Sequence, residues 1–381
     1  LLQLLLLLLL RPLFFSRPFL PSMHPQHINK IEIERITGTV PSQIGQLTSL
    51  TNLNMKYNDI SGSLPTQFGL STNLNRLDLS MNQLIGSIPT QFGMMTGLTS
   101  LLLFGPYSSN DDDDANANNS SSNNNNNDST NRRNNLTGPI PTELGKLTQL
   151  QDLGLNGNSL SGPIPSELGL LSMLTNLGLH GNDLTGQIPT QIGQMTSLIS
   201  LWVNGNQITG NIPSEIGQIT NLRNLYMFDN KLSGNIPTEV GQLSSLVHLQ
   251  LLDNNLTGPI PSEIGLLSNT LVSIMFQNNQ LSNSIPSEIG QLSSVSHVYL
   301  GSNRFIGSIP TEMGRMTNLQ ILSFANTTLT GSLPSELGRL TQLTYLDLRN
   351  TQLTGDIPTE LEWMLSNLPN DENKWSGLFG T

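Results

Sequence analysis

The chain has 381 residues, a formal net charge of -11 and no cysteine. The lack of cysteine excludes disulfide scaffolds, thiolate metal sites and cysteine nucleophiles, and a chain with only 16 basic residues does not offer the basic surface that nucleic-acid binding requires. The 22 prolines argue against an architecture of long helices, because proline interrupts the interior of a helix.

The amino-terminal segment is strongly apolar. Residues 1–10 have the sequence LLQLLLLLLL and precede Arg11. This run is too short to span a bilayer, but it has the length of a signal-peptide core. We expect residues 1–27 to form a leader outside the folded domain. Two origins stay open for it: a truncated signal sequence, or a translated low-complexity artefact, in which case residues 1–22 say nothing about secretion.

From residue 28 onward the chain is built from repeats of 24 residues. Their common string is Gly-x-(Ile/Leu/Val)-Pro, which begins at Gly38, Gly62, Gly86, Gly138, Gly162, Gly186, Gly210, Gly234, Gly258, Gly307, Gly331 and Gly355. Asn283 replaces the glycine in one further copy. A unit of this size cannot bury a core by itself, so successive units are expected to stack.

One repeat, which begins at Leu174, illustrates the first half of every copy. Leu177 and Leu179 alternate with a glycine, and this alternation predicts a short strand with both leucines facing inward. Asn182 follows at a turn, where its amide can donate to and accept from buried backbone groups of adjacent repeats. Parallel strands of successive repeats would then line one face of the molecule.

The second half of the same repeat predicts a different backbone. Gly186 permits a conformation that is closed to other residues. The extended piece around it is not expected to be a central strand, because Pro189 lacks a hydrogen-bond donor. Residues 190–192 suit one short helical turn on the outer side, and Gly193 is expected to end that turn.

These positions together resemble the leucine-rich repeat, in the 24-residue form typical of plant receptor-like proteins and kinases and of polygalacturonase-inhibitor-like proteins. The resemblance extends from Ile31 to Leu365 apart from one insertion. It implies an α/β repeat fold, namely a right-handed solenoid of about 12–13 repeats with a parallel β-sheet on the concave face and short 3₁₀ or helical turns on the convex side. It also implies a recognition module that is not an enzyme and needs no cofactor.

Two departures interrupt the repeat period. The larger one contains Asp111–Asp114 and Asn123–Asn127 and is too polar to bury a core, so we expect a disordered loop. A tolerated low-complexity expansion is favoured for this loop over an adhesive or signalling role. The smaller departure is one extra residue at Ser268–Thr270, which a bulge on the outer side would absorb. The expected segments are repeats over residues 28–103, the loop over 104–133, repeats over 134–365 and a cap or tail over 366–381.

The asparagine position changes at the carboxy-terminal end of the array. Thr327 and Thr351 occupy it in the last two repeats, and a hydroxyl can make only one or two of the bonds that an amide makes. We therefore expect a looser terminal end, with Trp375 and Phe379 of the tail covering the last turn.

No catalytic motif occurs in the chain: G-x-S-x-G, G-x-G-x-x-G, G-x-x-x-x-G-K and H-E-x-x-H are all absent. His248 and His297 occupy equivalent positions two repeats apart, with roughly 10 Å between their backbones. That separation favours surface or ligand-contacting roles over a shared metal ion, and no metal site is predicted.

Glutamate recurs directly after Pro-Ser or Pro-Thr, at Glu143, Glu167, Glu215, Glu239, Glu263, Glu288, Glu312, Glu336 and Glu360. In the first turn of a short outer helix a carboxylate is favoured by the exposed backbone N–H groups. We interpret this acidic stripe as structural, and a cation or partner site is the less favoured alternative.

The outward-facing positions of the predicted strands vary along the array and contain a run of large side chains. The candidate ligand-binding residues are Trp202, Tyr226, Phe228, His248, Leu252, Met275, His297 and Tyr299. Exposed aromatic clusters are typical of binding sites. The competing interpretation is that these side chains pack on one another and on neighbouring strands.

Sequons for N-glycosylation occur at six asparagines. They are Asn118, Asn119, Asn127, Asn135, Asn255 and Asn326. Asn135, Asn255 and Asn326 are the candidate acceptors outside the polar loop, and Asn135 and Asn255 lie beside asparagines of the predicted turn with their side chains outward.

Three functions are compatible with the sequence. The first is a ligand-binding receptor ectodomain at the cell surface or outside the cell, whose ligand is a protein, peptide or glycan, whose further partner is a co-receptor, and whose membrane contact would require a segment absent from this chain. The second is a secreted inhibitor of a cell-wall hydrolase. The third is a structural or adhesive surface protein, including one that binds ice or cell wall through rows of threonine and asparagine.

Overall fold

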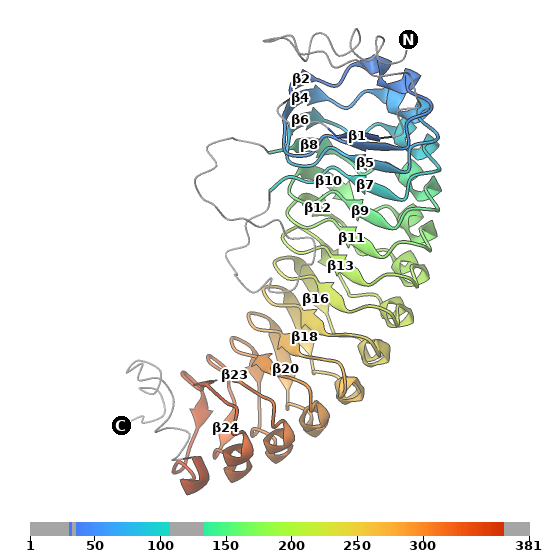
Figure 1. Cartoon of the computed structure of the whole chain (residues 1–381). Helices are drawn as coiled ribbons and strands as arrows, with labels where there is room; N and C mark the ends of the chain where they lie inside the picture. Colours follow the sequence, from blue (N-terminus) through green and yellow to red (C-terminus); the bar gives the residue numbers. More distant parts are fainter. Residues whose placement is uncertain (1–29, 33–35, 107–132, 362–381) are drawn as a thin grey trace. The chain divides into compact units, whose positions relative to one another are not determined.

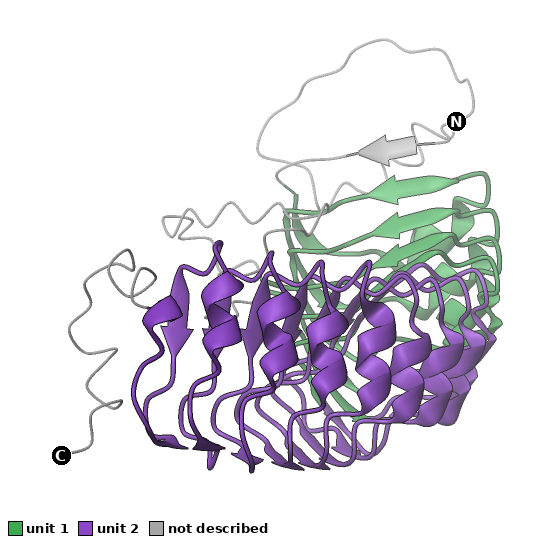
Figure 2. Ribbon diagram, turned by 90° about the horizontal axis from the view of Figure 1, so that it is seen from below, with its two compact units in different colours: residues 1–162, 178–183 green, residues 163–177, 184–381 purple. Residues whose placement is uncertain are grey.

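The computed structural model describes residues 30–32, 36–106 and 133–361, which form two compact units (Figures 1 and 2). Unit 1 comprises residues 1–162 and 178–183, and unit 2 comprises residues 163–177 and 184–381. The predicted leader, the predicted tail and most of the predicted polar loop, with its three sequons, lie outside the described residues. No helix of the described part is long and apolar enough to cross a membrane.

Unit 1 contains two parallel sheets and a row of short helices. The main sheet has the order β1 (Lys30–Glu32), β3 (Asn52–Asn54), β5 (Arg76–Asp78), β7 (Ser100–Leu102), β9 (Asp152–Gly154). The second sheet has the order β2 (Thr37–Thr39), β4 (Asp59–Ser63), β6 (Gln83–Gly86), β8 (Asn135–Gly138), β10 (Ser159–Pro163). The 3₁₀ helices are η1 (Ser42–Gln46), η2 (Thr66–Leu70), η3 (Thr90–Met94) and η4 (Thr142–Lys146).

Unit 2 repeats the same pattern. Its main sheet has the order β13 (Ser200–Trp202), β15 (Asn224–Tyr226), β17 (His248–Gln250), β19 (Ser273–Met275), β21 (His297–Tyr299), β23 (Ile321–Ser323), β25 (Tyr345–Asp347). The second sheet has the order β14 (Thr209–Gly210), β16 (Lys231–Gly234), β18 (Asn255–Gly258), β20 (Gln280–Asn283), β22 (Arg304–Phe305), and β24 (Thr330–Gly331) pairs with β26 (Gln352–Leu353). Strands β11 (Asn176–Gly178) and β12 (Asp183–Thr185) contain residues of both units, as does β10, whose last residue Pro163 belongs to unit 2.

The helices of unit 2 form a row on the side away from its main sheet (Figure 2). They are η5 (Ser166–Leu170), η6 (Thr190–Gln194), η7 (Ser214–Gln218), η8 (Thr238–Gln242), η9 (Ser262–Leu267), η10 (Ser287–Gln291), η11 (Thr311–Arg315) and η12 (Ser335–Arg339). The extra residue predicted near Ser268 lies here, because η9 has six residues where its neighbours have five. The predicted solenoid of parallel strands and short outer turns is confirmed.

The core of each unit is a stack of inward-facing aliphatic side chains. In unit 2, Leu225, Leu249 and Ile274 of consecutive main-sheet strands are fully buried, as the alternation of leucines predicted. Burial of one such side chain contributes about 1.5–3 kcal/mol to folding. The core therefore grows with every repeat and is shared between neighbours.

The second sheet corrects one expectation from the sequence. The extended piece around the glycine position was not expected to form a central strand, yet β16, β18 and β20 each pair with strands on both sides. The proline is compatible with this sheet because it lies beyond the paired residues: in the repeat of β12 the strand ends at Thr185 and Pro189 precedes η6. The missing N–H therefore falls outside the ladder.

The glycine that recurs in the outer helix of each repeat is required for a different reason from the one expected. Gly193 was expected to end the outer turn, but η6 continues through it to Gln194. A Cβ atom on Gly193 would lie 2.5 Å from the backbone oxygen of Glu215 in the next repeat. Glycine is therefore required by the close stacking of η6 and η7 and not by a helix terminus.

A ladder of buried asparagines joins successive repeats, as predicted. Asn254 is typical: its Nδ2 donates to the carbonyls of Met227 (3.0 Å), Leu251 (3.2 Å) and Leu252 (3.1 Å), and its Oδ1 accepts from the N–H of Leu232 (3.0 Å). The equivalent bonds recur through both units at Asn58, Asn82, Asn134, Asn158, Asn182, Asn206, Asn230, Asn279 and Asn303.

The terminal threonines replace this set of bonds with one. Thr327 Oγ1 donates to the carbonyl of Phe324 at 2.8 Å, and Thr351 Oγ1 donates to that of Leu348 at 2.9 Å. A hydroxyl is too short to reach the preceding repeat as the amide does. The threonine positions therefore keep the bond within the turn and give up the bonds between repeats.

We expect the substitution Asn254→Thr to lower the free energy of unfolding by about 1–3 kcal/mol, because it leaves the buried N–H of Leu232 and carbonyl of Met227 unsatisfied. Chemical denaturation of the full chain measures this change. Asn255→Thr, at the exposed neighbouring position, is the control and should stay within about 0.5 kcal/mol of the parent. Equal losses in the two variants would contradict a structural role for the ladder.

A partly buried imidazole is a second polar group of the fold, and its protonation has a measurable consequence. His180 follows β11, and its Nδ1 atom is inaccessible to solvent. Burial lowers the pKa of His180 from 6.5 to about 4. Between these two pKa values the unfolded chain binds a proton at His180 that the folded chain does not bind. The free energy of unfolding therefore decreases as the pH falls from about 6.5 towards 4.

We expect His180→Asn to remove about 2–3 kcal/mol of this pH-dependent loss. Asparagine occupies the corresponding position at Asn156 and Asn204 in the neighbouring repeats, so the substitution suits the backbone. Unfolding curves at pH 7 and pH 4 for both proteins measure the difference. The same loss between the two pH values in parent and variant would show that His180 is not the group responsible.

Candidate functional site

The outward side of the main sheet in unit 2 presents a regular grid of variable side chains, which we call the strand face. Strands β13 to β21 pair in one register, so that Leu201, Leu225, Leu249, Ile274 and Val298 face inward as partners. The residues on either side of each inward position point outward. Every repeat thus contributes three side chains to the strand face, and these can change without disturbing the core.

Six of the eight candidate ligand-binding residues meet on this face. Tyr226, Phe228, Leu252 and Met275 form one apolar cluster, against which Trp202 and Tyr299 pack. We call these six residues the apolar cluster. The rings of Tyr226 and Phe228 lie 6.4 Å apart at a tilt of 48°, within the range in which aromatic pairs attract each other.

The cluster packs on itself more than the sequence indicated. Tyr226, Phe228, Leu252 and Met275 retain only 7–9% of their exposure, whereas Trp202 and Tyr299 at its two ends are partly exposed. Both interpretations of the sequence thus have support within one cluster: the central four side chains pack, and the two aromatic residues at the ends offer accessible surface.

The two histidines flank the cluster without meeting each other. His248 Nδ1 and Ser273 Oγ are 2.9 Å apart, and His297 Nδ1 and Ser296 Oγ are 2.6 Å apart, each within hydrogen-bonding distance. Strand β19 lies between their strands. Burial, and to a lesser degree the nearby His297, lowers the pKa of His248, so its imidazole is uncharged at neutral pH. No group of three or more potential metal ligands occurs in the described residues.

The strand face also contains polar residues that the sequence analysis did not include in the site. Gln250 lies between Tyr226 and Met275 in the register and is 7% exposed. Gln277 follows Leu252 in the next repeat, and its Oε1 is buried without a hydrogen-bond partner. The repeat alignment contained the signal for both, because they occupy the same positions as Tyr226 and Phe228.

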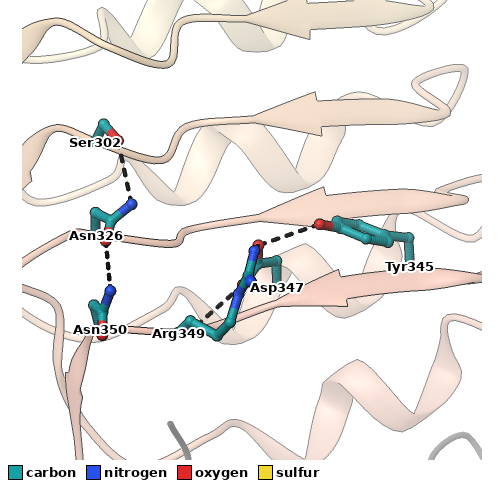
Figure 3. A network of polar contacts seen from close by, with 6 residues as sticks. All are labelled: Ser302, Asn326, Tyr345, Asp347, Arg349 and Asn350. Atoms are coloured by element: carbon teal, nitrogen blue, oxygen red, sulfur yellow. Dashed lines mark hydrogen bonds and ion pairs between the residues drawn. The ribbon is translucent and has the colours of Figure 1, made fainter. Parts of the chain in front are cut away.

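Near its carboxy-terminal end the strand face becomes polar (Figure 3). Arg349 donates from Nε and Nη2 to the two carboxylate oxygens of Asp347, at 2.9 and 2.6 Å, and the Tyr345 hydroxyl donates to the same carboxylate at 3.2 Å. Burial would raise the pKa of Asp347, but the bonds and charge of Arg349 outweigh burial and hold it below the usual value.

The three sequon asparagines in the described residues are exposed but differ in their contacts. Asn326 donates to Ser302 Oγ at 3.4 Å and accepts from Asn350 at 2.8 Å (Figure 3). Asn135 accepts from Ser159 Oγ at 2.7 Å. Asn255 lies at the start of β18. All three side chains are at the surface, and Asn326 takes part in a row of hydrogen bonds with Ser302 and Asn350.

Comparison with known families and structures supports the interpretation of these units as leucine-rich repeats. Residues 132–255 match the leucine-rich repeat region family, residues 293–353 match the leucine rich repeat family, and residues 49–70, 73–95 and 245–267 match single leucine rich repeats. No curated protein matches the chain in sequence.

Several solved structures are similar over most of the chain. The plant peptide hormone receptor RGFR1, in complex with RGF2, is 34% identical over 86% of this chain and 48% of its own, with a TM-score of 0.76. The leucine-rich-repeat ectodomain of the Arabidopsis receptor kinase HAESA, in complex with a peptide hormone, is 31% identical over 87% of this chain and 55% of its own, with a TM-score of 0.72. The chain thus spans about half the length of these receptor chains.

A bacterial protein matches over more of its own length. A leucine-rich-repeat protein of Leptospira interrogans is 32% identical over 87% of this chain and 74% of its own, with a TM-score of 0.65. The repeat spacing, the stacked parallel strands and these matches agree, and the chain belongs to the leucine-rich repeat family.

Proposed function

We propose that the chain is a non-catalytic recognition module that binds a peptide or protein ligand on the strand face of unit 2. The observation that carries this proposal is the apolar cluster, which gathers six large side chains on the strand face and leaves Trp202 and Tyr299 partly exposed. The inward positions of the same strands are filled by separate buried side chains, such as Leu225 and Leu249. Partly exposed aromatic side chains at the edge of such a cluster are favourable contacts for a ligand.

Similar structures support the class of ligand. RGFR1 and HAESA are each described in complex with a peptide, and HAESA has also been described with the co-receptor SERK1. By this similarity we place the chain outside the cell or at its surface, and we propose a co-receptor as a second partner. A peptide in extended conformation would cross the parallel strands and contact several repeats at once.

The two accessible residues of the cluster test this proposal. Peptides selected from a displayed random library against the full chain should bind the variant with Trp202→Ala and Tyr299→Ala at least about tenfold more weakly, since aromatic anchors account for much of the energy of an interface. The melting temperature should fall by only a few degrees, because both side chains lie at the edge of the packing.

Leu266→Ala is the matched control, since Leu266 is the most exposed large apolar residue in the described part of the chain, at 69%, and lies in η9 on the outer side. This variant should bind the selected peptides as the parent does. Retention of binding by the Trp202 and Tyr299 variant, with a large loss of melting temperature, would assign the cluster to packing alone.

A further inference from the structure

Two carboxylate side chains lie next to the apolar cluster in unit 2. Asp229 follows Phe228 directly and Asp253 follows Leu252, and both aspartates are exposed. Their backbone N–H groups donate to the carbonyls of Leu252 and Gln277, both at 3.1 Å. The backbone therefore fixes where each carboxylate lies relative to the cluster.

Two aspartates within main-sheet strands, by contrast, have their charge neutralised by an arginine. Asp78 of unit 1 pairs with Arg76 at 3.1 Å, and Asp347 of unit 2 pairs with Arg349 at 2.6 Å. Neither Asp229 nor Asp253 makes an ion pair with any residue in the described ranges. The single side-chain contact of Asp253 is a neutral one, from Asn278 Nδ2 at 2.8 Å to its Oδ1.

One more side-chain acceptor lies at the same edge. The Oε1 atom of Gln277 is buried and has no hydrogen-bond partner, and a buried unsatisfied acceptor costs about 1–3 kcal/mol. Gln277 occupies the position that Phe228 and Leu252 fill in the two preceding repeats, and its carbonyl accepts from the N–H of Asp253. This edge of the cluster thus combines two exposed carboxylates with one buried, unsatisfied amide oxygen.

We infer that the ligand is a cationic peptide segment, which places an apolar or aromatic side chain against the cluster and an arginine or lysine against Asp229 and Asp253. This inference rests on the proposed function and specifies its ligand. The net charge of -11 favours approach of the same kind of ligand over a longer range.

Three fluorescent peptides test the charge preference. Each has two phenylalanines in a glycine and serine background, with two intervening residues that are arginine, glutamine or glutamate. The full chain should bind the arginine peptide about tenfold or more tightly than the glutamine peptide and the glutamate peptide most weakly, and the preference should shrink at high salt. Equal binding of the arginine and glutamine peptides would overturn the inference.

The variant with Asp229→Asn and Asp253→Asn should lose the preference for arginine while it keeps its affinity for the glutamine peptide. Asparagine keeps the side-chain shape and suits the left-handed backbone. The control is Glu239→Gln with Glu263→Gln, which removes the same charge from η8 and η9 of the outer side, and it should keep the preference. If the control loses it equally, net charge alone is responsible and the inference fails.

The outcomes separate this inference from the function on which it rests. If the peptides bind in a manner that depends on Trp202 but not on charge, recognition stands and the cationic ligand is wrong. If no phenylalanine peptide binds the parent chain, both are wrong for this cluster.

Discussion

The fold depends on how each repeat satisfies the backbone groups at the turn after its main-sheet strand. This turn is buried on both sides by neighbouring repeats, so water cannot supply the missing partners. One carboxamide resolves the problem because it donates and accepts at once: Asn254 reaches the carbonyl of Met227 and the N–H of Leu232 in the preceding repeat. Stacking of repeats and satisfaction of the turn are thus the same interaction.

This arrangement separates the residues that build the solenoid from those that can vary. Inward leucines, the turn asparagine and the glycine between stacked helices are constrained by contacts in every repeat, as Gly193 is by Glu215. Outward positions of the strands carry different side chains from one repeat to the next. Tyr226 and Gln250 can therefore occupy equivalent positions in adjacent strands without a change in register, and recognition can be specified there at little cost to folding.

The parts of the structure that follow from the chemistry of a recurring residue could be predicted, whereas those that depend on which neighbouring atoms lie close could not. The strand leucines, the asparagine ladder and the positive φ of Gly186 follow from local chemistry. Gly193 was misassigned because its constraint lies in the next repeat. The burial of Met275 to 8% was likewise outside the reach of the sequence, since it depends on the neighbours that fold over it.

At the residue that follows the outward positions of each main-sheet strand, the requirement of the backbone can be separated from the contribution of the side chain. A positive φ recurs there, which Gly205 adopts without strain at 62° and Asp229 and Asp253 adopt at 52° and 53°. For a residue with a Cβ this conformation costs about 1 kcal/mol. The backbone gains the same N–H to carbonyl bond in each case, at 3.0 Å for Gly205 and 3.1 Å for both aspartates. The backbone bond therefore does not depend on the carboxylates. Asp253 accepts one further bond from Asn278 of the next repeat, and both aspartates contribute charge at the edge of the apolar cluster.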